Sequence, residues 1–434
     1  MTESDRLKIE VSSEIGKLEA VLLHEPNEEV ENMTPRTVQR ALYSDILNLS
    51  IAKKEYEQLF NVLSLLAEVR TVKGQLLKVL DNPQAREDLI RRICLSEDAM
   101  HCYEALMSMS SNKLATVLIE GLPAKIDSLT SFLANEYYAL YPLYNFYFTR
   151  DASVSIGNRV LICHMANKVR MRESLIMNAI FNNNQQFDCE VIDANDPSIT
   201  DPKIIMEGGD ILVVRDDILV IGNGLRTTSQ GIDFIVNRFK ALNKSGRYHV
   251  LVQQLPHTPE SFIHLDMVFT LLDKDKCMAF EPLILGDNQY QTIHIIFEDG
   301  VVKSIKSVTN LVKTLARLGV DLEPISCGGD DEWNQEREQW HSGANFFACA
   351  PGKVLTYARN LNTLDALSKA GFNIIPANDV IERSKSLTNF QKGDYEALGL
   401  NGLCAITIDG SELPRGGGGA RCMTMPLNRQ KVNW

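Results

Sequence analysis

The chain has 434 residues, of which 44% are hydrophobic and 23% are charged. It carries 44 lysines and arginines against 56 aspartates and glutamates, a net charge of −12. This length and apolar content suffice for one large hydrophobic core or two ordinary ones. Because phosphate backbones need clustered cations, an acidic balance argues against a nucleic-acid partner.

The start of the chain and its cysteines indicate the compartment. The first residues, MTESDRLKIE, lack the apolar core of a signal peptide, and no apolar stretch reaches the roughly 18–20 residues that cross a bilayer. The nine cysteines are an odd number, and none are spaced as C-x-x-C, so neither a disulfide framework nor a zinc knuckle is predicted. We expect a cytoplasmic protein with free thiols and no membrane contact.

Four segments alternate apolar and polar residues on both sides of a short polar turn, which is the pattern of a β-hairpin. They cover residues 152–165, 210–223, 267–282 and 344–359. Each is followed by a stretch of helical period and then by a short strand, so each predicts a ββαβ unit. The hairpins recur every roughly 60–80 residues, a spacing close to that of repeat arrays and propellers.

A fifth unit is expected to close the ring. Its strands are predicted at residues 18–24, 69–72 and 405–408, and its helix at residues 55–66. Residues 75–140 show helical periodicity alone, which predicts a helical domain inserted into a catalytic α/β part made of residues 1–74 and 141–434. The polar segment 381–401 predicts a surface lobe or a lid.

A polar cluster precedes the first strand of each unit, and like positions in units around one axis would converge. The clusters contain a cysteine, a histidine and at least four carboxylates, namely Cys422, His264, Asp151, Glu207, Asp210 and Asp266. A thiolate beside a histidine suits nucleophilic attack, and two carboxylates bind a guanidinium in fork geometry. The predicted electrophile is therefore a guanidinium carbon.

Six motifs occur in an order that resembles the arginine deiminases. They are LLHEPNEEVENMTP (22–35), FTRD (148–151), MEGGD (206–210), HLDMVF (264–269), REQWHSGAN (337–345) and ARCMTMPLNR (420–429). The resemblance covers nearly the whole chain and implies the pentein fold, a five-bladed α/β propeller with a helical domain inserted in the first blade. It also implies hydrolysis of free L-arginine to L-citrulline and ammonium through a covalent thiouronium intermediate, without cofactor or metal, in a dimer or larger homo-oligomer.

The same resemblance assigns the chemistry. It makes Cys422 the nucleophile, His264 the general acid and base, Asp151 and Asp266 the guanidinium clamp, and Glu207 the residue that steadies His264. Flanking carboxylates should raise the pKa of Cys422, so we expect a neutral thiol in the empty site and ionisation when the guanidinium binds.

The resemblance also assigns the substrate-binding residues. Arg226 and either Arg170 or Arg172 would take the α-carboxylate, Asn145 and Phe148 would line the pocket, and Asp210 would support the site from behind. In part of the family an arginine stands five residues before the nucleophile. Here that position is Gly417, with Arg415 and Arg421 nearby. The identity of a gating arginine stays open.

Several alternatives remain at this point. The eight other cysteines are interpreted as small buried hydrophobes. The glycines 416–419 lack phosphate-loop spacing and favour a flexible loop at a substrate tunnel. The rival functions are an amidinotransferase, a hydrolase of agmatine or methylarginine, conversion of arginine to ornithine, and a non-catalytic binding module.

Overall fold

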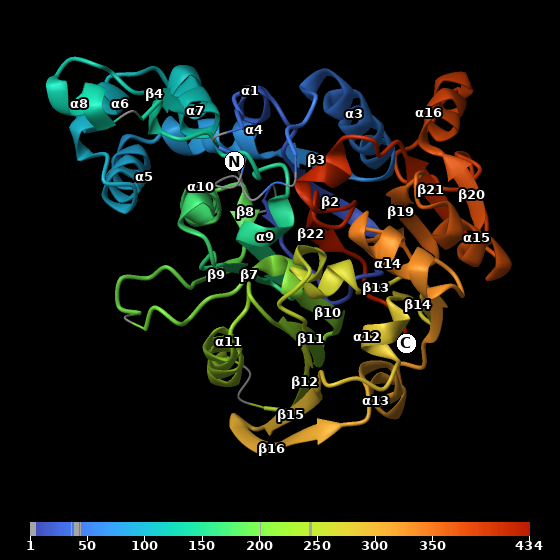
Figure 1. Cartoon of the computed structure of the whole chain (residues 1–434). Helices are drawn as coiled ribbons and strands as arrows, with labels where there is room; N and C mark the ends of the chain where they lie inside the picture. The colour runs from blue at the N-terminus through green and yellow to red at the C-terminus, as the bar shows by residue number, and fades with distance from the viewer. Residues whose placement is uncertain are drawn as a thin grey trace.

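The computed structural model describes residues 6–434 except 36, 39–42, 44, 135, 200, 243 and 244. Within these residues, five sheets of three or more strands share one pattern. Each contains an antiparallel pair, and one strand of that pair lies parallel to a third strand. The protein is therefore a mixed α/β fold built from a repeated unit (Figure 1).

The first two sheets follow the predicted ββαβ order. The first consists of β6 (Ser153–Ile156), β7 (Arg159–Ile162) and β9 (Glu190–Asp193), with helix α10 (Met171–Asn183) before the last strand. The second consists of β10 (Ile211–Arg215), β11 (Ile218–Asn223) and β12 (Arg247–Gln254), with helix α11 (Ser229–Leu242).

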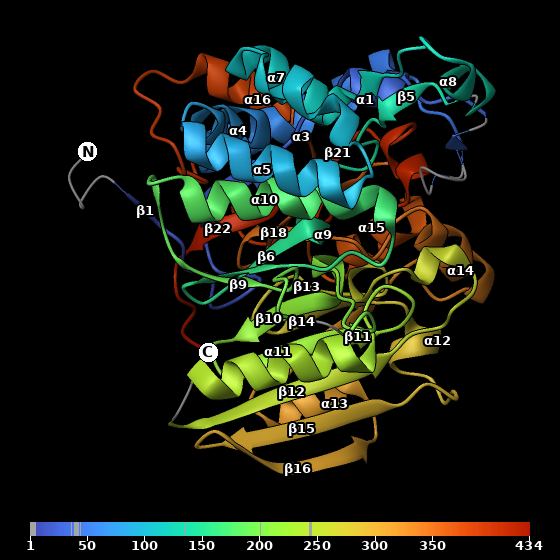
Figure 2. The same cartoon turned by 90° about the vertical axis from the view of Figure 1, so that its left-hand side faces the viewer.

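An unpredicted hairpin, β15 (Thr292–Glu298) and β16 (Val301–Val308), extends the second sheet although it lies in the third unit of the sequence. Its turn, Asp299-Gly300, has positive φ at both residues, which matches the twist of a two-residue hairpin. An Asp-Gly pair is a common sequence signal of a two-residue hairpin turn, so the sequence did contain a sign of this hairpin. Figure 2 shows the hairpin stacked beside β12 at the base of the molecule.

The third and fourth sheets also begin with their predicted hairpins. The third consists of β13 (Phe269–Leu271), β14 (Lys276–Ala279) and β17 (Glu323–Ser326), with helices α12 (Glu281–Ile284) and α13 (Leu311–Arg317) between the last two strands. The fourth has the order β18 (Phe347–Ala350), β19 (Lys353–Tyr357), β21 (Cys404–Ile408) and β20 (Asn373–Pro376), with helices α14 (Glu332–Trp340) and α15 (Leu361–Lys369) nearby.

One strand assignment was wrong. The strand predicted at residues 405–408 for the fifth unit is β21, which lies parallel to β19 in the fourth sheet, between β19 and β20. The fifth sheet is instead closed by β22 (Met425–Arg429), antiparallel to β2 (Leu18–Leu23), which pairs in parallel with β3 (Glu68–Thr71). Pro426 in β22 hid this strand in the sequence, because proline is tolerated in a sheet mainly at edges, and β22 is an edge strand.

Within residues 72–140, the described part of the chain is mostly helical. It contains α4 (Val72–Leu80), α5 (Pro83–Ser96), α6 (Tyr103–Met107), α7 (Ser111–Glu120), α8 (Leu129–Ala134) and the short strand pair β4 (Leu122–Pro123) and β5 (Tyr138–Leu140). Helices α4 and α5 pack on α10, which is buried along most of its length for this reason. Figure 2 shows α5 lying along α10.

The remaining elements cover the sheets or lead into the site. They are α1 (Glu28–Glu31), α3 (Leu49–Leu66), α9 (Thr149–Ala152), α16 (Ala377–Ser386) and the parallel pair β1 (Leu7–Lys8) and β8 (Phe187–Asp188). The segment 381–401 continues α16 and packs on α3, where Gly393 N–H donates to the carbonyl of Leu65 at 2.9 Å. In the described part of the chain, no helix combines the length and the apolar character needed to cross a membrane.

Candidate functional site

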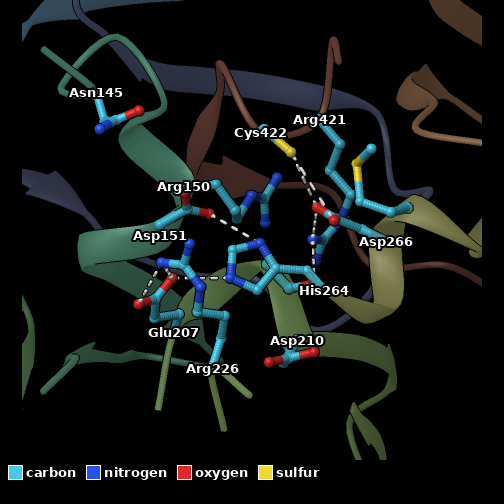
Figure 3. Close-up of polar contacts among 12 residues, drawn as sticks. Asn145, Arg150, Asp151, Glu207, Asp210, Arg226, His264, Asp266, Arg421 and Cys422 are labelled. Atoms are coloured by element: carbon cyan, nitrogen blue, oxygen red, sulfur yellow. Dashed lines mark hydrogen bonds and ion pairs between the residues drawn. The ribbon is translucent and has the colours of Figure 1, made fainter. Parts of the chain in front are cut away.

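Short turns at the starts of the hairpins carry the polar residues singled out in the sequence. Asp151 lies on α9, directly before β6, and Glu207 lies at the start of a 3-10 turn, Gly208–Asp210, directly before β10. His264 stands at the start of a second 3-10 turn, Leu265–Met267, which carries Asp266 before β13. The structure brings these turns together, and Figure 3 shows their side chains around a common centre with Cys422.

The thiol of Cys422 is buried, with 2% exposure. Asn345 Nδ2 donates to its Sγ at 3.1 Å, and the carboxylate oxygens of Asp266 lie 3.5 and 3.8 Å from the same sulfur. Burial, followed by the charges of Asp266 and Asp151, raises the pKa of the Cys422 thiol well above its ordinary value. In the empty site this environment favours the neutral form of the thiol.

His264 is fully buried beside two carboxylates. Its Nε2 donates to Glu207 Oε2 at 2.8 Å, and its Nδ1 lies 3.7 Å from Asp151 Oδ1. Burial opposes a charge on the ring, yet Asp151 and the hydrogen bond to Glu207 outweigh it and raise the pKa of His264 to about 9. The imidazole thus holds its second proton at neutral pH. Gly209 allows this placement, because a Cβ there would lie 2.4 Å from His264 Nδ1.

Glu207 connects the histidine to two arginines. Its Oε1 accepts from the backbone N–H of Ala166 at 3.0 Å and from Arg226 at 3.3 Å, and Arg170 lies 3.9 Å from Oε2. Burial alone would raise the pKa of Glu207, but Arg226 and the hydrogen bond from His264 hold it below its ordinary value. Glu207 is therefore an anion that fixes the orientation and the charge of the His264 ring.

Arg170 holds Asp151 Oδ2, whereas Asp151 Oδ1 faces His264 Nδ1 at 3.7 Å without a hydrogen bond. Arg170 donates to Asp151 Oδ2 at 2.7 Å, to the carbonyl of Asn145 at 3.3 Å and to both oxygens of Glu173. Asp151 Oδ1 and His264 Nδ1 are buried without a hydrogen-bond partner. An unpartnered buried carboxylate oxygen carries a free-energy cost that a bound donor relieves, so this position suits a guanidinium N–H.

Asp210 supports His264 from below. Its Oδ1 accepts from the backbone N–H of Leu265 at 2.9 Å, and burial raises the pKa of Asp210 to about 7. A Cβ at Gly222 would lie 2.2 Å from this oxygen, so glycine is required there. The side chain stabilises the turn that carries His264.

The two arginines between which the sequence could not decide lie in different places. Arg170 is part of the site, whereas Arg172 is not. Arg172 donates to Glu97 Oε1 at 2.7 Å and to the backbone carbonyls of Leu118 and Tyr141, in the helical segment. It joins α10 to α5 and α7. Arg170 and Arg172 are two positions apart at the start of a helix, where such side chains point in different directions.

A cavity of about 480 Å³ borders the site. It is lined by the neighbours of His264 and Asp266 in the sequence, Ile263 and Met267, and by Arg226, Trp340 and Gly417. Arg226 is 15% exposed, so its guanidinium can meet a guest that enters through the cavity. Arg415 also lines the cavity, where it pairs with Asp45 and Glu412.

Two of the glycines in residues 416–419, Gly416 and Gly418, pack closely on aromatic side chains. A Cβ at Gly416 would lie 2.0 Å from the hydroxyl of Tyr147, and one at Gly418 would lie 2.5 Å from the ring of Phe148. Phe148 is 3% exposed and its ring centroid lies 4.1 Å from that of Tyr147. Close approach of the backbone, which only glycine permits, accounts for these two positions.

Sequence reasoning missed the roles of Asn345, Arg421 and Glu14. Besides donating to the thiol, Asn345 accepts through Oδ1 from the backbone N–H groups of Arg421 at 2.9 Å and Cys422 at 3.2 Å. Asn345 ends the motif at residues 337–345, so its position was a signal. Glu14 lies outside every motif, and no pattern in the sequence indicated it.

Asp151, Glu207 and His264 also offer ligand atoms within 4.8 Å of one another, a geometry that could hold a metal ion. Arg170 and Arg226 already balance the two carboxylates, at 2.7 and 3.3 Å. The two carboxylates of this group therefore already have arginine cations beside them. A buried thiol, an imidazolium and converging carboxylates on repeated ββαβ sheets together define a cysteine-dependent α/β protein of the guanidino-group-modifying class.

Comparison with known proteins specifies the class further. The family model described as arginine deiminase matches residues 39–429. An arginine deiminase of Staphylococcus aureus (strain Newman) is 32% identical over 98% of this chain and 99% of its own length. One of Streptococcus equi subsp. zooepidemicus (strain H70) is 33% identical over 98% of both chains. The chain belongs to the arginine deiminase family of hydrolases.

Solved structures agree with the fold. The N-terminal domain of ArgZ, an arginine dihydrolase from cyanobacteria bound to product, matches with a TM-score of 0.51 at 14% identity, covering 95% of this chain and 98% of that one. SxtG, an amidinotransferase from Microseira wollei, matches with a TM-score of 0.51 at 11% identity, covering 98% of both chains. At such identities, these likenesses show the mixed α/β pentein fold alone.

Proposed function

We propose that this protein hydrolyses free L-arginine to L-citrulline and ammonium through a covalent thiouronium intermediate on Cys422. The observation that carries the proposal is the juxtaposition of a buried thiol, contacted by Asp266 and Asn345, with the unpartnered carboxylate oxygen of Asp151. Two carboxylates on different units can hold a planar guanidinium in fork geometry while the sulfur faces its carbon. Family membership supports the same reaction.

The substrate would be held at both ends. Asp151 and Asp266 bind the guanidinium, and Glu207 keeps His264 in place beside it. Arg226, which lines the cavity, is the arginine that we assign to the α-carboxylate. Arg170 is occupied by Asp151 and Glu173, so its role in this proposal is to hold Asp151.

The charges of the empty site set the order of proton transfers. The raised pKa of His264, about 9, means that the imidazolium is already present before substrate binds. A bound guanidinium offsets the carboxylate field, so the Cys422 thiol loses its proton to solvent as substrate enters. The resulting thiolate is the nucleophile.

The chemical steps then balance. The sulfur attacks the guanidinium carbon and forms a C–S bond, His264 donates its proton to one nitrogen, and that C–N bond breaks to release ammonia. The now neutral His264 takes a proton from water, which attacks the same carbon. The C–S bond breaks and its electron pair returns to Cys422; the remaining hydroxyl proton passes from the adduct to the thiolate, which leaves citrulline with the water oxygen and restores the thiol.

Four further features belong to this proposal. The five sheets would form the blades of one propeller, which is supported by the convergence of their first strands on one site. The helical segment, residues 75–140, would be a domain inserted between residues 1–74 and 141–434. A cytoplasmic location and a dimer or larger assembly stay predictions, the latter to be checked by light scattering.

Product analysis tests the function. The protein is incubated with arginine, and citrulline, ornithine and ammonia are quantified for the wild type, Cys422→Ala and the matched control Cys189→Ala, a part-buried thiol outside the site. We expect one citrulline and one ammonia per arginine, lost only in Cys422→Ala. Ornithine with two ammonia molecules would indicate a dihydrolase, and transfer to an added amine an amidinotransferase. Either result would overturn the proposal.

A further inference from the structure

The side chain of Arg421 runs from the residue before the nucleophile into the interior, with 1% exposure. Its Nη1 donates to Asp266 Oδ2 at 2.8 Å and to the carbonyl of Gly209 at 3.4 Å. Its Nε and Nη2 donate to the two oxygens of Glu14, each at 3.0 Å, and Nη2 also donates to the carbonyl of Ile211 at 2.8 Å. The guanidinium therefore connects Asp266 to a second carboxylate.

Glu14 is the far end of this chain of contacts. It precedes β2 and is buried. Its Oε1 accepts from the backbone N–H of Val213 at 3.3 Å and lies 3.9 Å from Arg150 Nη1. Burial would raise the pKa of Glu14, but Arg421 and Arg150 lower it to about 2. Glu14 is thus an anion throughout the neutral range.

The near end is the nucleophile. Asp266 Oδ2, the oxygen that accepts from Arg421 at 2.8 Å, is the one that lies 3.5 Å from Cys422 Sγ. The thiol and the guanidinium consequently share one carboxylate oxygen. The charge of Arg421 also acts directly on the thiol, so a change in its charge or position affects the sulfur both through space and through Asp266.

We propose that Arg421 and Glu14 are positioning residues that hold Asp266 in place and set the net charge experienced by Cys422. This inference rests on the proposed function, in which Cys422 is the nucleophile. Glu14, Arg421 and Asp266 together carry one negative charge. Neutralising Glu14 leaves no net charge on the group, whereas neutralising Arg421 leaves two negative charges, so the two changes act on the thiol in opposite directions.

Other charged and titratable groups face this network and stay the same in each variant. Asp151 acts on the sulfur from α9, and the phenols of Tyr147 and Tyr357 lie near it. Arg150 and Arg429 act on Glu14 from the other side. A shift between variants therefore reports the substituted charge.

The test measures alkylation of Cys422 by iodoacetamide against pH, in resting protein without arginine. Trypsin isolates Cys422 in the peptide 422–429, because Arg421 and Arg429 flank it, and in Arg421→Gln it isolates the peptide 416–429. We expect the midpoint of alkylation to fall by about one pH unit in Glu14→Gln and to rise in Arg421→Gln. Shifts of the same sign, or no shift in either variant, would overturn the proposal.

Two further variants separate charge from packing. Arg421→Lys keeps the cation, so its midpoint should stay closer to that of the wild type than the midpoint of Arg421→Gln. Glu338→Gln removes a buried carboxylate that binds Thr363 and Asn362, away from this network, and should leave the midpoint unchanged. If Arg421→Gln does not fold, the test rests on Glu14→Gln. An alkylation midpoint that does not fall in Glu14→Gln would then refute the inference.

The readout is independent of the reaction. Alkylation of the resting thiol needs no turnover, so a protein that made ornithine from arginine would disprove the proposed function and still report the shifts. Conversely, if the protein forms citrulline but the alkylation midpoints do not shift, the proposed function holds and the proposed role of Glu14 and Arg421 is wrong. The two failures are therefore distinguishable.

Discussion

The Nε2 atom of His264 lies 2.8 Å from Oε2 of Glu207, deep in the site. This contact joins the acid and base of the proposed reaction to an anion that Arg226 keeps ionised. Together with the charge of Asp151, this contact raises the pKa of His264 and so favours the imidazolium before substrate binds.

Glu207→Gln should move the alkaline limit of activity to lower pH. The pKa of His264 is raised from 6.5 to about 9, so the imidazolium is lost as pH rises through about 9. Without the Glu207 charge, that loss begins earlier, and we expect kcat at neutral pH to fall about 100-fold. The measurement is kcat against pH from 6 to 10. Glu207→Asp, which keeps the charge, is the control, and an unmoved alkaline limb in Glu207→Gln would contradict the assignment.

Asn345→Ala should slow the first half of the reaction. The side chain donates to the thiol at 3.1 Å and fixes the backbone N–H groups of Arg421 and Cys422, so the variant loses both the donor to the sulfur and the geometry of the loop. We expect kcat/KM to fall about 10- to 100-fold. Burst kinetics would show slower formation of the covalent intermediate, and a normal burst with slow release would argue against this role.

Arg172→Met should cost stability and leave substrate binding intact. The change leaves the carbonyls of Leu118 and Tyr141 and the carboxylate of Glu97 without their donor. The loss should be about 3 kcal/mol in the free energy of unfolding, measured with urea. KM for arginine should stay within about twofold of the wild type. A large rise in KM with unchanged stability would instead show that Arg172 contributes to substrate binding.

Asp210→Asn should flatten the pH dependence of stability. The pKa of Asp210 is raised from 3.8 to about 7, so its contribution to folding is full below about 3.8 and is lost as pH rises through about 7. An amide oxygen can still accept from Leu265 N–H. We therefore expect the variant to lose less in Tm between pH 5.5 and 8.5 than the wild type. Equal losses in the two proteins would show that Asp210 does not titrate in this range.

Much of this molecule could be predicted from local patterns. Alternation of apolar residues around turns such as Gly157-Asn158 located the hairpins, and these lie where β6 and β7 are found. Because each polar cluster stood at the same place in its unit, the convergence of Asp151, His264 and Cys422 followed from the repeat. These features depend on neighbours in the sequence, which is why the sequence by itself determined them.

Other features depend on contacts between distant segments, and only the tertiary structure decided them. Pairing of β22 with β2 closes the fifth sheet, although a proline weakens the strand pattern. Arg170 and Arg172 are only two positions apart, yet Arg170 binds Asp151 in the site, whereas Arg172 binds Glu97 because the helical segment packs on α10. The contact of Glu14 with Arg421 joins residues 407 positions apart. Such pairings are selected by burial and charge in three dimensions, which local patterns do not encode.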